Sequence, residues 1–144
     1  MINSVQDSAL VLSSNTANII FSSDVVRTRS ANCCGWLTHV LGSTQYQLTE
    51  PGIYEIQFSS NVTSTVVGQV ALAIKLNGEV LSCTEMDATV ATSGVYENVS
   101  TNRQIRICCN GNATITVGSI PSVGTTETQV PTIKNASLII KKVA

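Results

Sequence analysis

Hydrophobic and polar residues alternate along much of the chain from Asn61 onward, with the period of two that is typical of strands with one buried face. In the segment Gln69–Leu76 (QVALAIKL), the large aliphatic residues share one face of the predicted strand: Val70, Leu72, Ile74 and Leu76. Asn77-Gly78 follows and supplies the two positive-φ positions of a type I′ turn. We therefore predict a hairpin that begins with this strand.

A second hairpin is predicted from Gln104–Cys109, the dipeptide Asn110-Gly111 and Asn112–Gly118. Its expected inward residues are Ile105, Ile107, Cys109, Ala113, Ile115 and Val117. The run Ala136–Val143 predicts a last strand with Leu138 and Ile140 on one face. Helical periodicity with capping residues is absent, so the predicted fold class is all-β.

Residues 1–35 lack this turn chemistry and contain two brief apolar runs, Ala9–Leu12 and Asn18–Phe21. Segments of this kind commonly become ordered only on a partner, so one interpretation divides the chain into an N-terminal arm or peripheral strands (1–35) and a jelly-roll domain (36–144). In the alternative, both runs are the first strands of the sandwich, because a jelly roll needs about eight strands. The segment Gly118–Pro131, which has two prolines and two glycines, predicts a long exposed loop.

The segment Gln47–Asn61 (QLTEPGIYEIQFSSN) contains a Pro-Gly turn followed by Gly52-x-Tyr54-x-Ile56-x-Phe58. Glycine opens the strand where the chain turns sharply, and the alternate large side chains fill one side of a two-sheet core. Tyr54, Ile56 and Phe58 are therefore predicted core residues, whereas Glu55 points to the opposite face.

This strand resembles the G-x-Y-x-F-x-F/Y strand of the C1q/TNF-like jelly roll, with Ile56 in place of a phenylalanine. The order of elements after it is also similar, and the resemblance extends roughly from Thr38 to Val143. It implies a two-sheet antiparallel jelly-roll sandwich that assembles as a homotrimer.

Within that superfamily, the chain resembles small structural proteins of tailed bacteriophages and their prophages. The shared features are the Gly-x-Tyr strand, an Asn-rich turn near paired cysteines and a short last strand with lysines. This implies a non-enzymatic virion structural protein: a trimeric knob, made in the bacterial cytoplasm, that decorates a phage capsid (head) or fibre and binds a capsid or fibre protein. The alternative is a recognition or adhesin module that binds a host-surface receptor or glycan through Gly118–Pro131 and Asp87–Gly94.

Charged residues are only 12% of the chain and the net charge is −1, so no field is expected that would attract nucleic acid or an anionic membrane. The same scarcity leaves little repulsion between monomers and favours a homo-oligomer. No stretch approaches the ~18 apolar residues of a membrane span and no signal peptide is recognised, so we expect a soluble protein that stays where it is made.

Residues for catalysis or metal binding are sparse. His39 is the one histidine of the chain. The converging groups of a nucleophilic active site and the clustered histidines of a cupin-type metal site are therefore missing. A strand or interface role is predicted for His39. Glu85 and Asp87 are two residues apart, which is weak support for calcium, and a solvated face is predicted. The sequence therefore predicts no enzyme activity, no cofactor and no catalytic, cofactor-binding or metal-binding residue.

Five cysteines form two adjacent pairs and a single residue: Cys33, Cys34, Cys83, Cys108 and Cys109. An odd count with adjacent pairs is a poor disulfide framework, and adjacent strand residues point to opposite faces, which disfavours zinc. A zinc site to which each adjacent pair donates one thiolate, from neighbouring strands, stays an alternative. We expect reduced, buried thiols.

Overall fold

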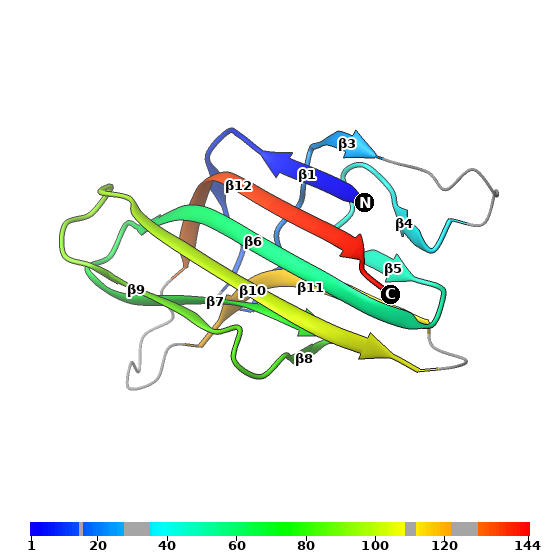
Figure 1. The fold of residues 1–144 in the computed structure, drawn as a ribbon. Coiled ribbons are helices and arrows are strands. Elements are labelled where there is room, and N and C mark those ends of the chain that lie inside the picture. The colour runs from blue at the N-terminus through cyan, green and yellow to red at the C-terminus, as the bar shows by residue number, and fades with distance from the viewer. Residues whose placement is uncertain (15, 28–34, 109–111, 122–129) are drawn as a thin grey trace.

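The computed structural model describes residues 1–14, 16–27, 35–108, 112–121 and 130–144. Two antiparallel β-sheets are stacked as layers, and both chain termini lie at the same end of the sandwich (Figure 1). No described segment is helical, so the all-β prediction is confirmed. The described residues therefore contain no helix that could cross a membrane.

The first sheet has the strand order β10-β6-β12-β1-β3, and β2 also pairs with β12. Its strands are β1 (Ile2–Gln6), β2 (Leu10–Val11), β3 (Ser23–Arg27), β6 (Gly52–Ser64), β10 (Glu97–Ile107) and β12 (Pro131–Lys142). The pairing of β12 with β6 shifts in register between Lys134 and Ser137, and Asn135 has a φ of 53° at this bulge.

The second sheet has the order β4-β5-β11-β7-β8, and β9 also pairs with β7. Its strands are β4 (Leu37–His39), β5 (Tyr46–Leu48), β7 (Gly68–Leu76), β8 (Glu79–Val80), β9 (Met86–Val90) and β11 (Ala113–Ile120). Asn77 and Gly78 have φ values of 52° and 85°, as a type I′ turn requires, and β7 pairs with β8 across them. The first predicted hairpin is confirmed.

The second predicted hairpin is wrong, although its inward residues are buried. Ile105 and Ile107 of β10 and Ile115 and Val117 of β11 all lie in the core. However, β10 pairs with β6 in the first sheet, whereas β11 pairs with β5 and β7 in the second. The two strands therefore lie in different sheets instead of side by side. Cys109 and Asn110-Gly111 are outside the described residues.

The core between the sheets includes Tyr54, Ile56 and Phe58 of β6, all fully or almost fully buried, as predicted. The Tyr54 hydroxyl donates a hydrogen bond to the Glu50 carbonyl (2.6 Å), which satisfies the polar end of this ring. Leu138 and Ile140 of β12 are buried beside them, so the predicted inward face of the last strand is also confirmed.

The N-terminal residues are built into both sheets. β1 lies between β12 and β3 in the first sheet, and Ile2, Leu12, Ile19 and Phe21 are buried in the core. This placement corresponds to the alternative interpretation, in which the runs at 9–12 and 18–21 belong to the sandwich, and not to an arm that leaves the domain. Residues 28–34 are outside the described part of the chain.

A second contact fixes the N-terminal segment against the second sheet. The Ile19 amide donates to the Val117 carbonyl (2.7 Å) and the Ser119 amide to the Ala17 carbonyl (2.8 Å). A Cβ atom at Gly118 would lie 2.7 Å from the Cα atom of Asn18, so the backbones approach where only glycine fits. The predicted loop Gly118–Pro131 is correspondingly shorter, because β11 continues to Ile120 and β12 begins at Pro131.

The outward face of β7 is buried too, which alternation alone does not predict. Ala71, Ala73 and Lys75 are all less than a tenth exposed. The Lys75 ammonium group donates to the Thr16 carbonyl (3.3 Å) and to Asn18 Oδ1 (3.0 Å). Burial lowers the pKa of Lys75.

Candidate functional site

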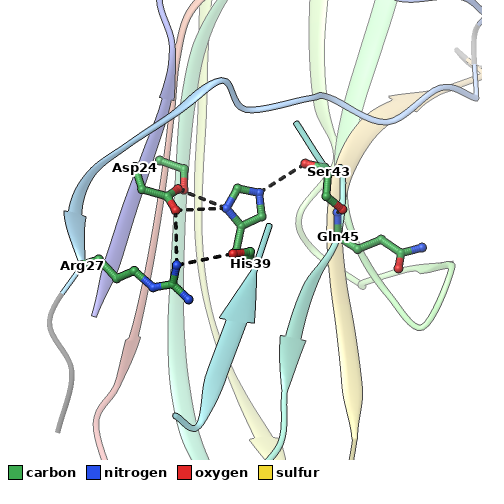
Figure 2. Close-up of polar contacts among 6 residues, drawn as sticks. Asp24, Arg27, His39, Ser43 and Gln45 are labelled. Carbon is green, nitrogen blue, oxygen red and sulfur yellow. Dashed lines mark hydrogen bonds and ion pairs between the residues drawn. The ribbon is translucent and has the colours of Figure 1, made fainter. Parts of the chain in front are cut away.

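The one histidine of the chain is buried where the edges of the two sheets meet. His39 ends β4, an edge strand of the second sheet, and pairs with Tyr46 of β5. The side chain is turned inward because Thr38 before it is exposed and strand residues alternate between faces. β3, the edge strand of the first sheet, lies beside it and contributes Asp24 and Arg27 (Figure 2).

Aromatic rings hold the histidine ring in place. The rings of His39 and Tyr46 are stacked, with 4.0 Å between centroids and 9° between planes. Phe21 contacts Tyr46 edge-on, with centroids 5.9 Å apart. Burial raises the pKa of Tyr46 well above its ordinary value. The histidine therefore has one fixed orientation inside the protein.

Both ring nitrogens of His39 face acceptor oxygens (Figure 2). Nδ1 lies 3.1 Å and 3.3 Å from the two carboxylate oxygens of Asp24, and Nε2 lies 3.2 Å from the Ser43 carbonyl oxygen. The Gln45 amide donates to Ser43 Oγ (3.1 Å), which stabilises the turn that presents this carbonyl. The His39 side chain has no exposed surface, and that of Asp24 is 9% exposed.

Asp24 has two further neighbours. The Ser4 hydroxyl of β1 donates a hydrogen bond to Oδ1, and Arg27 Nη1 lies 4.0 Å from Oδ2. Arg27 Nη1 also donates to the His39 carbonyl (3.4 Å). The serine thus bonds to the carboxylate and not to the imidazole, so the arrangement ties β1, β3, β4 and the β4–β5 turn together without activating a nucleophile.

The other candidate residues are dispersed. Glu85 precedes β9 and Asp87 lies within it, and both are exposed. Within the described ranges, no three His, Cys, Asp or Glu residues converge as metal ligands would. Cys83 and Cys108 are free and exposed, so the prediction of buried thiols is wrong for these two, while Cys33, Cys34 and Cys109 are outside the described residues.

The outward face of the first sheet, which we call the outer face, carries a hollow of about 510 Å³. Ser59 of β6 is paired in register with Ser100 of β10 and with Ser137 of β12, so three small side chains form a transverse row, the serine row. The adjacent row has the longer side chains of Asn102, Gln57 and Ile139. The hollow therefore results from three small residues in neighbouring strands.

Glu55 lies next along the outer face and is held by hydrogen bonds. Gln57 and Asn102 donate to Oε1, and Lys141 Nζ lies 3.2 Å from Oε2. The bond from Gln57, followed by that from Lys141, lowers the pKa of Glu55. The negative charge of Glu55 is therefore balanced by Lys141 on the same face.

Exposed apolar side chains gather at the end of the sandwich opposite the termini. This loop-end cluster consists of Val66, Val67, Val95 and Tyr96, from the β6–β7 and β9–β10 loops. The two loops are joined by a hydrogen bond from the Gly94 amide to the Ser64 carbonyl (3.4 Å), and Figure 1 shows them together at that end. Lys134 lies over the Tyr96 ring at 5.9 Å.

Sequence reasoning missed both the Asp24–His39 pair and the loop-end cluster. Asp24 and His39 are 15 residues apart on strands of different sheets, and no motif joins them. Single valines in turns resemble ordinary surface residues. For the serine row, the alternation of the strand after Gly52 indicates only that Ser59 points outward. The other two serines are brought beside it by strand pairing between segments that are far apart in the sequence.

Comparison with known proteins gives structural neighbours only. No protein-family model and no curated protein matches the chain. The globular domain of zebrafish complement 1qA matches with a TM-score of 0.68 and 10% identity, over 99% of this chain and 96% of that one. Two crystal structures of murine APRIL also match. The structure at pH 5.0 has a TM-score of 0.56 and 14% identity, over 92% of this chain and 98% of that one. The structure at pH 8.5 has a TM-score of 0.53 and 12% identity, over 92% of this chain and 96% of that one. By its fold, therefore, the chain is a C1q/TNF-like jelly roll.

Proposed function

We propose that this chain is a non-enzymatic assembly and recognition module that forms a homotrimer and binds a partner through loops at one end. The observation that carries the proposal is the match of almost the whole chain to the globular domains of complement 1qA and APRIL. Domains of this class typically form trimers, and the sparse charge of the chain favours association.

The outer face is the surface that we assign to contact between copies. It spans the long strands β6, β10 and β12, and its hollow is lined mainly by small or uncharged polar side chains. The Glu55 carboxylate is already paired with Lys141, so covering it leaves no isolated charge. A neighbouring copy can place a protruding side chain over the serine row.

Light scattering on purified variants tests the trimer and its surface together. The unmodified chain is expected at three times its own mass. Ser59→Lys places a long cation in the hollow and should give monomers, whereas Thr89→Lys, an exposed position on β9 of the second sheet, should remain trimeric. A stable monomer at micromolar concentration contradicts the trimer, and a trimeric Ser59→Lys contradicts the assigned surface.

The loop-end cluster is the surface that we assign to recognition, with a host-surface receptor or glycan as the partner. Loops on a rigid sandwich commonly carry binding residues, and exposed aromatic side chains are enriched at interfaces. Tyr96→Ser should abolish binding of labelled protein to a glycan array or to host cells. The control is Val80→Ser on β8, which removes a comparably exposed apolar side chain elsewhere. Equal binding by both variants counts against this surface.

A second candidate function is that of a virion structural protein that decorates a phage capsid or fibre. The specific observation is the resemblance of the Gly52-x-Tyr54 strand, the paired cysteines and the last strand to small phage proteins. Mass spectrometry of purified virions tests it, because a decorating knob is present at high copy. Its absence from virions refutes this candidate and leaves the recognition module standing.

A further inference from the structure

The geometry points to Asn77 as a site of spontaneous covalent modification, which one hydrogen bond restrains in the folded protein. Asn77-Gly78 forms the turn between β7 and β8, and both residues are exposed. The reaction needs water as its only co-reactant. This inference goes beyond the proposed function and does not depend on assembly.

The reaction joins two groups that are adjacent in the chain. The Gly78 amide nitrogen attacks the side-chain carbonyl carbon of Asn77, and the side-chain nitrogen leaves as ammonia with the proton of the attacking amide. Water then opens the resulting succinimide ring to aspartate or to isoaspartate, in which the main chain runs through the side-chain carbons. No electrons are gained or lost. Glycine leaves its nitrogen unobstructed, and a Cβ atom at Gly78 would meet nothing within 4 Å, so water reaches the site.

The Asn77 carboxamide is fixed by β11. The Thr114 amide donates a hydrogen bond to Asn77 Oδ1 (2.8 Å), and the Asn77 amide donates to the Thr114 carbonyl (2.8 Å). The backbone pairing of these strands ends at Leu76 and Ile115, so the Asn77 side chain extends it by one residue. Ring closure changes the torsion angles of Asn77, which has a φ of 52° in this turn. The bond to Thr114 must therefore open before the ring can form.

The two products have different structural consequences. Isoaspartate adds a main-chain carbon between residues 77 and 78, and a type I′ turn has no place for it. β8 is held to β7 through two residue pairs, Lys75 with Val80 and Leu76 with Glu79, so the altered turn should release β8. Aspartate keeps the main chain unchanged and retains a side-chain oxygen that can accept from the Thr114 amide. It should therefore leave the turn intact.

Peptide mass spectrometry tests the site on the full chain. Folded protein and protein unfolded in urea are held in the same mildly alkaline buffer and then cleaved after lysine and arginine. Asn77 then lies in peptide 76–103, apart from the second Asn-Gly dipeptide in peptide 107–134. We expect both products at Asn77, formed on the order of tenfold more slowly in the folded protein. An unfolded chain that gives no product at Asn77 overturns the proposal.

Hydrogen exchange of the Thr114 amide measures the opening that the reaction needs. Its protection factor and the slowing of the reaction in the folded protein report the same equilibrium, so the two factors should agree. Reaction of folded protein at the unfolded rate, while Thr114 stays protected, refutes the restraint. Isolated isoaspartate chains should also lose the protection of the Leu81 amide, which bonds to the Ile74 carbonyl (2.9 Å), while β10 stays protected. Unchanged Leu81 protection contradicts the release of β8.

Two glycine variants, compared in the unfolded chain, separate the chemistry from folding. Gly78→Ala places a side chain beside the attacking nitrogen and should slow the reaction at Asn77 on the order of tenfold. The matched control is Gly94→Ala. Gly94 has a similar φ (80° against 85°) and also has nothing within 4 Å of its Cβ position, but it follows a serine. This control should react as the unmodified chain does, and equal rates for the two variants refute attack by the Gly78 nitrogen.

Discussion

Replacing Phe21 by alanine should destabilise the protein strongly, although this residue belongs to the segment whose sequence shows least regularity. Phe21 has no exposed surface and packs edge-on against Tyr46. Removing a buried phenylalanine costs about 3–5 kcal/mol, which includes the cavity left behind and the lost aromatic pair. Because domains of this kind are stable by roughly 5–15 kcal/mol, the change removes a large fraction of the total.

The adjacent residue supplies the control. Ile20 is 41% exposed, so its replacement by alanine removes less buried surface and should cost about 1 kcal/mol or less. Both variants shorten an apolar side chain in the same segment of backbone. A difference between them therefore reports burial and not a general property of the segment.

Urea unfolding followed by the fluorescence of Trp36, the single tryptophan, measures both variants. With a slope of about 2 kcal/mol per molar urea, Phe21→Ala should lower the midpoint by about 2 M and Ile20→Ala by about 0.5 M. Protein concentration must be equal throughout, because association stabilises the folded state. Equal midpoints for the two variants would refute the placement of Phe21 in the core.

Three further outcomes are expected. Phe58→Ala should lower the free energy of unfolding by about 3–5 kcal/mol in the same assay, whereas Ser59→Ala on the outer face should change it by less than about 0.5 kcal/mol; equal effects would mean that the strand register is wrong. Gly118→Ala should cost about 1–3 kcal/mol in thermal unfolding, because its Cβ overlaps the N-terminal backbone, and an unchanged melting temperature would contradict that contact. Cys83 and Cys108 should react rapidly with a thiol reagent in the native protein, as peptide mass spectrometry can verify, and protection of either would contradict its exposure.

Local chemistry predicted the elements whose partners are near in sequence. Asn77-Gly78 specified a turn of defined backbone geometry, and Tyr54, Ile56 and Phe58 specified one inward face, because both signals act within a few residues. The same reasoning failed for β10 and β11. An Asn-Gly dipeptide between two alternating runs has the same pattern whether the strands pair or cross to the other sheet, and the choice depends on β5, β6 and β7.

The N-terminal strands and the histidine site depended on contacts that alternation does not encode. In β1, the buried positions are Ile2 and Ser4, and the serine is buried because it bonds to Asp24. Asp24 itself is enclosed between β1 and β4, elements that lie on either side of it in sequence and belong to different sheets. A polar residue in a short segment resembles a surface position until its partner is known.

The position of β12 sets the order in which this fold can form during synthesis. β12 lies inside the first sheet, between β6 and β1, yet among the described residues it is the last strand along the chain. Until residues 131–142 have left the ribosome, β1 and β6 have no strand to join them, and each exposes an unpaired edge. The second sheet is complete earlier, because β4, β5, β7, β8, β9 and β11 all precede β12. Nascent chains that stall before residue 131 should therefore be the species most prone to aggregation, and folding should be slow because its closing contacts join the two most distant strands of the sequence.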